Sequence, residues 1–64
     1  MIDDRAAVHP DARIGSDVSI GPFTIVEAGV TIGSGTRVGS HVVIRQGTRL
    51  GQGNHIYSFA SIGE

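Results

Sequence analysis

Residues 32–44 read IGSGTRVGSHVVI, and this stretch contains two full periods of a six-residue repeat. Ile32, Val38 and Ile44 lie six residues apart, and the smaller residues Thr36 and Val42 precede the last two by two positions. Residues two apart lie on the same side of an extended strand, so each hexad presents a small and a large side chain to one interior. Glycine follows both Ile32 and Val38, where the chain must bend. The stretch predicts short strands separated by tight turns.

The six-residue period continues through the whole chain. Every sixth position from Ile2 to Ile62 is Ile, Leu or Val, although only 16 of the 64 residues are of these types. The position two residues earlier is small in nearly every hexad, with Asn54 as the main exception. A helix would repeat its apolar positions at three and four residues, and stacked hairpins would not keep every hexad in one phase. The pattern therefore predicts an all-β solenoid of hexapeptide repeats.

Three hexads are expected to close one triangular coil, with successive coils stacked about 4.8 Å apart by parallel ladder bonds. Residues 1–64 then form a single β-helix segment of about three and a half coils. The last hexad is incomplete, and we expect Glu64 to be a boundary within a longer solenoid. Side chains three hexads apart lie over one another, which gives the inward columns Val8/Val26/Ile44/Ile62, Ile14/Ile32/Leu50 and Ile20/Val38/Ile56.

Composition and charge exclude several classes of partner. The chain has no cysteine, so disulfides and thiolate metal sites are excluded and an oxidising compartment has no support. Its formal net charge is −1 and its Arg residues are spread out, whereas nucleic-acid and membrane surfaces select clustered basic residues. No apolar run approaches the roughly 20 residues of a membrane span, and the start MIDDRAAVHP lacks the features of a signal peptide. We expect a cytoplasmic protein.

One outward face is predicted to be apolar. Ile25 and Val43 are the only Ile, Leu or Val residues outside the inward positions, and they lie one expected coil apart. The neighbouring corner column contains Arg5, Phe23, His41 and Phe59, whereas the outward columns of the other two sheets are polar. The candidate subunit interface consists of Phe23, Ile25, His41, Val43 and Phe59. A prism with one apolar face can close a ring of copies, and we expect a homotrimer.

No catalytic, cofactor-binding or metal-binding residue is assigned, and no cofactor is expected. His9, His41 and His55 fall in three different columns, so one chain cannot bring them to a metal ion, which needs three or four ligands at about 2.0–2.3 Å. No carboxylate is placed to orient any of them as a general base. A metal site shared between subunits remains an open alternative.

Other polar features are interpreted as structural. Glu27 and Arg45 are one coil apart and are expected to form an exposed ion pair. The stretches GSGTRVG and GQGN resemble phosphate-binding loops, but no helix follows them. Asn54 needs hydrogen-bond partners if it is buried. An ice-binding solenoid is excluded because Thr24, Thr36 and Thr48 are expected to point inward and do not stack on one another.

The hexads as a class resemble those of bacterial hexapeptide acyltransferases. The stretches MID, VHP, IGPFTIV, IGSGTRVGSHVVI and GNHIYSFASIGE are similar, within that class, to the N-terminal region of O-acyltransferases that use acyl carrier protein and UDP-N-acetylglucosamine. The likeness covers the whole chain, and its most specific part is N-x-I-Y-x-F-A-S-I-G-E at residues 54–64.

The resemblance implies a left-handed parallel β-helix, a homotrimer and a cytoplasmic reaction that needs no metal. That reaction moves a 3-hydroxyacyl group from acyl carrier protein to the 3-hydroxyl of UDP-N-acetylglucosamine and opens lipid A synthesis. The family's histidine general base lies several coils beyond this segment, in a cleft between subunits. Residues 1–64 alone are therefore expected to be structural and inactive. Two alternatives stay open: another hexapeptide acyl- or acetyltransferase or a gamma-type carbonic anhydrase, and a non-enzymatic assembly solenoid.

Overall fold

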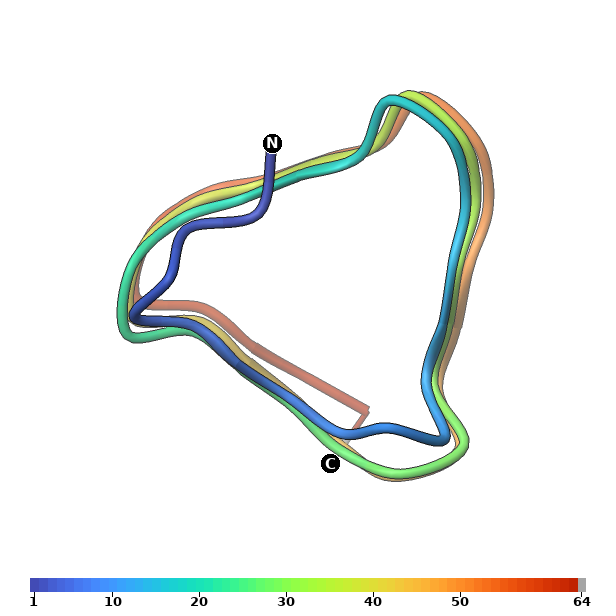
Figure 1. The fold of residues 1–64 in the computed structure, drawn as a ribbon, viewed down its shortest axis with the longest axis horizontal. Helices are drawn as coiled ribbons and strands as arrows, with labels where there is room; N and C mark the ends of the chain where they lie inside the picture. Colours follow the sequence, from blue (N-terminus) through green and yellow to red (C-terminus); the bar gives the residue numbers. More distant parts are fainter. Residues whose placement is uncertain (64) are drawn as a thin grey trace.

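Three parallel β-sheets form the walls of a triangular solenoid (Figure 1). The computed structural model describes residues 1–63, and in this range it contains ten strands of two residues each. No helix of the length and apolarity needed to cross a membrane occurs among these residues. The strands are β1 (Ala7–Val8), β2 (Arg13–Ile14), β3 (Ser19–Ile20), β4 (Ile25–Val26), β5 (Thr31–Ile32), β6 (Arg37–Val38), β7 (Val43–Ile44), β8 (Arg49–Leu50), β9 (His55–Ile56) and β10 (Ser61–Ile62).

Each strand pairs with the strand three hexads further along the chain. Strands β1-β4-β7-β10 form the sheet that we call wall 1, β2-β5-β8 form wall 2, and β3-β6-β9 form wall 3. In wall 1, Ala7 pairs with Ile25, and Ile25 pairs in turn with Val43. The ladder bonds join an N–H of one coil to a carbonyl oxygen of the next, as from Ala7 N to Thr24 O at 2.8 Å. The predicted columns are confirmed in all three walls.

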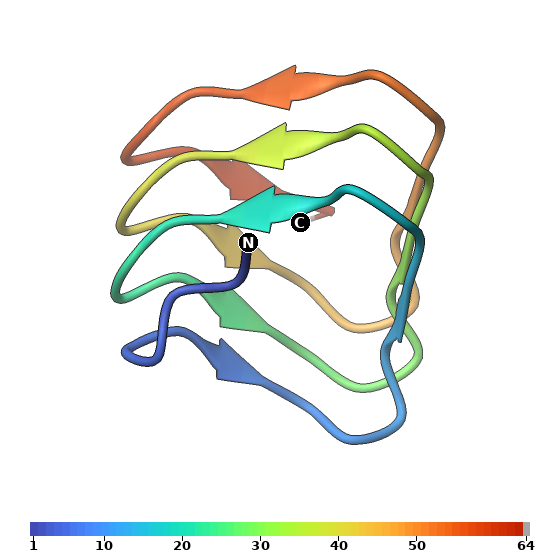
Figure 2. The same cartoon turned by 45° about the horizontal axis from the view of Figure 1, so that its top comes forward.

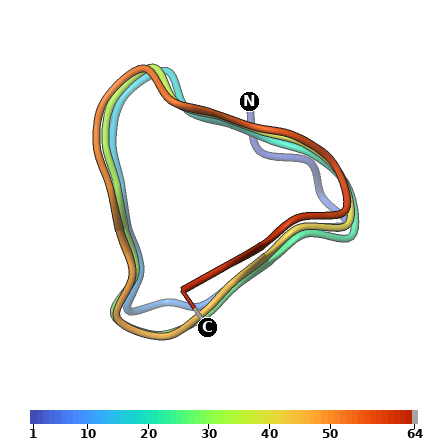
Figure 3. The same ribbon diagram turned by 180° about the vertical axis from the view of Figure 1, so that it is seen from behind.

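The solenoid is left-handed, as the resemblance implied. In Figure 1 the chain runs counter-clockwise while it recedes from the viewer, from the blue N-terminus to the fainter red C-terminus. From behind, it runs clockwise while it approaches the viewer (Figure 3). Figure 2 shows the coils stacked as layers, with strands of one wall above one another. The connections between its parallel strands are therefore left-handed, whereas most crossover connections in proteins are right-handed.

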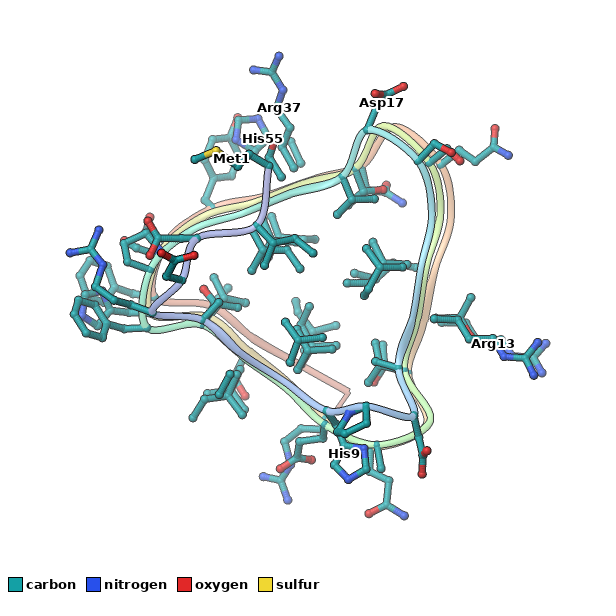
Figure 4. The ribbon with its side chains drawn as sticks, viewed as in Figure 1. Met1, His9, Arg13, Asp17, Arg37 and His55 are labelled. Atoms are coloured by element: carbon teal, nitrogen blue, oxygen red, sulfur yellow. The ribbon has the colours of Figure 1, made fainter. Side chains whose placement is uncertain are left out.

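The core lies inside the prism at the level of the middle coils. The equivalent inward residues of the outer coils, such as Val8 and Leu50, are only partly buried because a coil packs against them on one side alone. Arg13 and Arg49 are both exposed, as predicted, and Figure 4 shows Arg13 pointing away from wall 2. The buried apolar residues come from both inward positions of the hexad: Val18, Ile20, Val26, Val30, Ile32, Val38, Val42 and Ile44.

Two threonines occupy the small inward position and leave no polar atom unpaired. Thr24 and Thr36 are both 0% exposed. The Thr24 hydroxyl donates to Gly39 O at 2.7 Å and accepts from Val42 N at 3.3 Å, and the Thr36 hydroxyl bonds to the next coil in the same way. A buried hydroxyl is tolerated when it is bonded like this. These bonds join each coil to the one above it.

Asn54 is exposed, although its position in the hexad suggested an inward residue. Its side chain is exposed, because no coil of residues 1–63 lies above it. Its backbone N–H donates to Thr36 Oγ1 at 3.3 Å, so the backbone keeps the pattern of the other hexads.

The corners share one backbone conformation. The residue three positions after each inward aliphatic has a positive φ in every hexad from Asp17 to Phe59. Glycine adopts this conformation at little cost and fills four of these positions. The other four are Asp17, Phe23, His41 and Phe59, with φ between 57° and 65°.

Gly33 is required for a different reason, which is the close approach of the next coil. A Cβ atom on Gly33 would lie 2.6 Å from the backbone carbon of Gly51 and 2.7 Å from the nitrogen of Gln52. Neither neighbour is a flexible side chain that could move aside. At Gly47 an added Cβ atom would have no neighbour within 4 Å. There the backbone conformation favours glycine instead, because φ is +79°.

We predict that Gly33→Ala destabilises the protein more than Gly47→Ala. Overpacking against backbone costs about 1–3 kcal/mol or more, whereas an alanine in the left-handed region costs about 1–2 kcal/mol. Urea unfolding followed by circular dichroism measures both free energies of unfolding. Equal losses, or a larger loss for Gly47→Ala, would contradict the close approach of the coils at Gly33.

Candidate functional site

The outward side of wall 1 carries the apolar face that the sequence predicted. Ile25 lies directly between Ala7 and Val43 in the register of the sheet, and Ser61 completes the column. Ile25 is 45% exposed although it is a large aliphatic residue, and Val43 is half-buried. The outward residues of the other walls are polar, and Figure 4 shows Arg13 and Arg37 pointing away from the prism.

A stack of rings borders this face, and we call it the aromatic corner. It contains Arg5, Phe23, His41 and Phe59 at the corner between walls 3 and 1. The His41 ring lies 5.2 Å from the Phe23 ring and 5.1 Å from the Phe59 ring, between centroids. The Arg5 guanidinium carbon lies 5.4 Å from the centroid of Phe23, within cation–π range. The stack predicted for the three ring residues is confirmed.

The aromatic corner holds bulky residues in a conformation that favours glycine. Phe23, His41 and Phe59 all have positive φ, which costs about 1–2 kcal/mol for each residue with a Cβ atom. Contacts between stacked rings contribute about 0.5–1.5 kcal/mol each and offset much of that cost. Glycine would avoid the cost altogether, as at the other two corners from Gly29 onward. The rings remain mostly outside the core, with Phe23 53% and Phe59 79% exposed.

A groove lies on wall 1 beyond the Ile25 column, toward the corner where Figure 4 labels His9. Its volume is about 440 Å³. Apolar residues line its floor, and polar residues line its rim. The lining residues are Ala7, Val8, Ile25, Val26 and Ala28 on the floor, where Val8 and Val26 turn their side chains into the core, and His9, Glu27 and Gln46 on the rim.

Glu27 is held in place at the rim of this groove. Its Oε1 accepts a hydrogen bond from Gln46 N at 2.8 Å and lies 3.2 Å from Arg45 Nε. The ion pair predicted between Glu27 and Arg45 is therefore present. Both side chains are well exposed, so the pair contributes about 0–1 kcal/mol to stability. The main effect of these two contacts is to fix the position of the Glu27 carboxylate at the rim of the groove.

The three histidines lie apart in the structure. His9 is at the rim of the groove, His41 is in the aromatic corner, and His55 is outside wall 3, where its ring stacks on Tyr57 at 4.4 Å. His9 Nδ1 accepts a hydrogen bond from Asp11 N at 3.0 Å and lies 4.0 Å from Asp11 Oδ2. Over residues 1–63, no group of three or more His, Cys, Asp or Glu side chains is placed to share a metal ion.

The charge at the base of the aromatic corner is also paired. Arg5 donates to Asp3 through its backbone N–H at 2.8 Å, through Nε at 3.0 Å and through Nη2 at 3.1 Å. The side-chain hydrogen bond from Arg5 is the largest cause that lowers the pKa of Asp3, and the backbone hydrogen bond adds to it. The same side-chain bond raises the pKa of Arg5. The pair holds the guanidinium below Phe23.

Sequence reasoning found the apolar column and the ring stack but missed three features. The positive φ of Phe23, His41 and Phe59 had a signal, because these residues occupy the slot that glycine fills in four other hexads. No pattern in the sequence indicated the groove, since its volume depends on the packing of small residues from different coils. The corner column placed Arg5 next to Phe23, but the orientation of its guanidinium over the ring had no signal in the sequence.

Comparison with known proteins places this geometry among hexapeptide transferases. Residues 11–46 match the family described as bacterial transferase hexapeptide (six repeats). The chain is 62% identical over all 64 residues to the acyl-[acyl-carrier-protein]–UDP-N-acetylglucosamine O-acyltransferase of Pseudomonas paraeruginosa. It is 50% identical over the same length to the Stutzerimonas stutzeri protein of that name. The 64 residues make up 25% of each relative, so the chain spans about a quarter of their length.

Solved structures give the same relationship. LpxA from Acinetobacter baumannii superposes with a TM-score of 0.96 at 52% identity, over 98% of this chain and 24% of that one. The UDP-N-acetylglucosamine acyltransferase of Francisella novicida superposes with a TM-score of 0.97 at 41% identity, over 100% of this chain and 23% of that one. The backbone path of residues 1–63 is therefore that of these enzymes over the matched region.

We predict that Arg5→Gln raises the pKa of the Asp3 carboxyl toward its ordinary value, because the hydrogen bonds from the guanidinium are lost while the one from the backbone N–H of residue 5 remains. A carboxyl whose pKa is lower in the folded state adds stability above its unfolded pKa of about 3.9. That stability is lost as the pH falls through the folded-state pKa. An NMR titration of Asp3 measures the shift, with Arg13→Gln as the control. An unchanged Asp3 titration in Arg5→Gln would contradict the pairing.

Proposed function

The chain belongs to the bacterial transferase hexapeptide family, and we propose that it forms the first coils of an O-acyltransferase. In this proposal the whole protein moves a 3-hydroxyacyl group from acyl carrier protein to the 3-hydroxyl of UDP-N-acetylglucosamine, in the cytoplasm, as the opening step of lipid A synthesis. The observation that carries the proposal is the 62% identity over all 64 residues to a relative named for that activity. Hexads alone would support only the wider family.

We assign these coils a structural part in that reaction. The ladder bonds and the two buried threonines tie each coil to the next, so the prism is a stiff base on which later coils stack at fixed heights. His9 accepts a hydrogen bond at Nδ1 within its own turn, with the Asp11 carboxylate 4.0 Å away, and we assign none of residues 1–63 a part in the chemical step. The chemistry is therefore proposed to lie in the rest of the protein.

We also propose that the protein is a homotrimer and that wall 1 contributes to the contact between subunits. The proposed contact residues are Phe23, Ile25, His41, Val43 and Phe59. Their support is that large apolar side chains of one wall are exposed together, at 45% for Ile25, 53% for Phe23 and 79% for Phe59. The outward columns of walls 2 and 3 carry Arg, Thr, Ser and His. A single apolar wall on a prism suits a closed ring with three-fold symmetry.

We predict that the protein carrying residues 1–64 transfers a 3-hydroxyacyl group from acyl carrier protein to UDP-N-acetylglucosamine, and that residues 1–64 alone do not. In this proposal the general base and the substrate cleft belong to the rest of the protein. Mass spectrometry of the nucleotide sugar detects the acylated product in both samples. A different acceptor used in preference to UDP-N-acetylglucosamine would contradict the substrate, and product formed by the segment alone would contradict its structural role.

We predict that Ile25→Arg and Val43→Arg each weaken association of the subunits by at least tenfold, or about 1.4 kcal/mol, because a charge is buried in an apolar contact. The fold should be retained, since both side chains point outward. Multi-angle light scattering over a range of concentrations measures the association, and circular dichroism checks the fold. Thr31→Arg, at the equivalent outward position of wall 2, is the matched control. Equal effects of all three substitutions would contradict the assignment of wall 1.

A further inference from the structure

A buried threonine of one coil inserts its hydroxyl into a corner of the coil above. In the corner that begins at Gly33, the backbone closes its own turn, from Thr36 N to Gly33 O at 3.4 Å. One coil higher, the equivalent groups are Asn54 N and Gly51 O. The Thr36 hydroxyl bridges them, because it accepts from Asn54 N at 3.3 Å and donates to Gly51 O at 2.8 Å. A side chain from below can therefore take the place of the turn bond.

The same bridge occurs at a second corner. Thr24 Oγ1 donates to Gly39 O at 2.7 Å and accepts from Val42 N at 3.3 Å. Each bridge needs one donor and one acceptor on the side chain below the corner. Valine has neither, and the corner above Val18 is the one that closes its own turn from Thr36 N. The residue below a corner thus decides how that corner is bonded.

Asn54 occupies the place of such a threonine. It follows Val18 and Thr36 in one inward column, next to the strands of wall 3. Val18 and Thr36 each have a coil above them and are 5% and 0% exposed, whereas Asn54 is exposed at the upper end of the column. A side-chain amide carries both groups that the bridge needs, since Oδ1 accepts and Nδ2 donates.

We propose that Asn54 bridges the corner of the coil that stacks on it, with Oδ1 accepting from a backbone N–H and Nδ2 donating to a backbone carbonyl of that corner. The inference rests on the proposed function, in which later coils of the same protein stack on residues 1–63. It adds which side chain joins the two parts and what that side chain binds.

The position of the Asn54 amide supports this assignment. An added Cβ atom on Gly33 would lie 2.7 Å from Gly51 O, which belongs to the coil above, so the Cβ direction at this corner faces upward. An added Cβ atom on Gly51 would lie 3.6 Å from Asn54 Nδ2. The amide is therefore on the side of its own corner where the backbone of the next corner would lie.

The cost of burying an amide explains why the bridge matters. An amide that loses water without gaining hydrogen bonds destabilises the folded state, so a small apolar residue such as Val18 would otherwise suit this column better. With both bonds made, the amide fixes the height and register of the next coil. Asn54 would then be a positioning residue for the part of the protein to which the reaction is assigned.

NMR of the whole protein tests the bridge directly. The side-chain NH₂ of Asn54 is assigned as the pair of signals that is lost in Asn54→Thr. We expect its hydrogens to exchange with solvent at least tenfold more slowly than those of Gln52. Gln52 is the matched control because it lies in the column of Ser16 and Ser34, which are exposed although coils lie above them. Equal exchange of the two amides would overturn the inference.

Substitutions separate the bridge from burial alone. Asn54→Thr keeps a donor and an acceptor, as at Thr36, and should leave the melting temperature of the whole protein nearly unchanged. Asn54→Asp loses the donor and places a negative charge against a carbonyl, so the melting temperature should fall by at least about 4 °C. Gln52→Glu makes the same chemical change at an exposed position and should have little effect.

Two results of these substitutions would overturn the bridge. One is a fall for Asn54→Thr as large as that for Asn54→Asp, and the other is a fall for Asn54→Asp no larger than that for Gln52→Glu. The proposed function is judged separately, by acyl transfer in the unsubstituted protein. A protected Asn54 amide in a protein without that activity would support the bridge and overturn the function, and an active protein with a freely exchanging Asn54 amide would overturn the bridge alone.

Discussion

The parallel ladder between coils is the constraint on which the rest of the structure depends. Each wall is built from strands of only two residues, which could not pair stably on their own. They hold because every strand is bonded to its equivalent in the next coil, as Ala7 N is to Thr24 O and Arg13 N is to Val30 O. A strict register follows, and it places like residues over like residues in every column. The core, the apolar face and the ring stack all result from that one repeat distance.

Much of this architecture could be predicted from the sequence because the period is short and the inward positions tolerate little variation. Ile14 and Ile32 had to stack if each coil contains three hexads, and they do. The environment of Asn54 could not be predicted from the repeat. Its place in the hexad predicted an inward residue, but its exposure depends on what lies above it, and no pattern within residues 1–63 can supply that.

The candidate site was predictable in part for the same reason. Phe23, His41 and Phe59 could be placed in one column from their spacing, and their contact through stacked rings is confirmed. The groove could not be predicted, because it arises where small residues such as Ala7 and Ala28 of different coils leave space beside Ile25. Volumes of this kind depend on side-chain size summed over neighbours that are distant in sequence. The contact between subunits could not be predicted in detail, because it also depends on the surface of a second copy.

The register also determines which changes of chain length this fold can absorb. An insertion of three hexads would add one complete coil and return every later residue to its original wall. An insertion of a single hexad would move each later hexad to the next wall, so that Ile25 and Val43 would no longer lie on the same side if it fell between them. An insertion that is not a whole number of hexads would keep Ile32 inward only if the extra residues left the coil as a loop at a corner. Changes in length among proteins of this shape should therefore occur in whole hexads ahead of Phe23, and in whole coils beyond it.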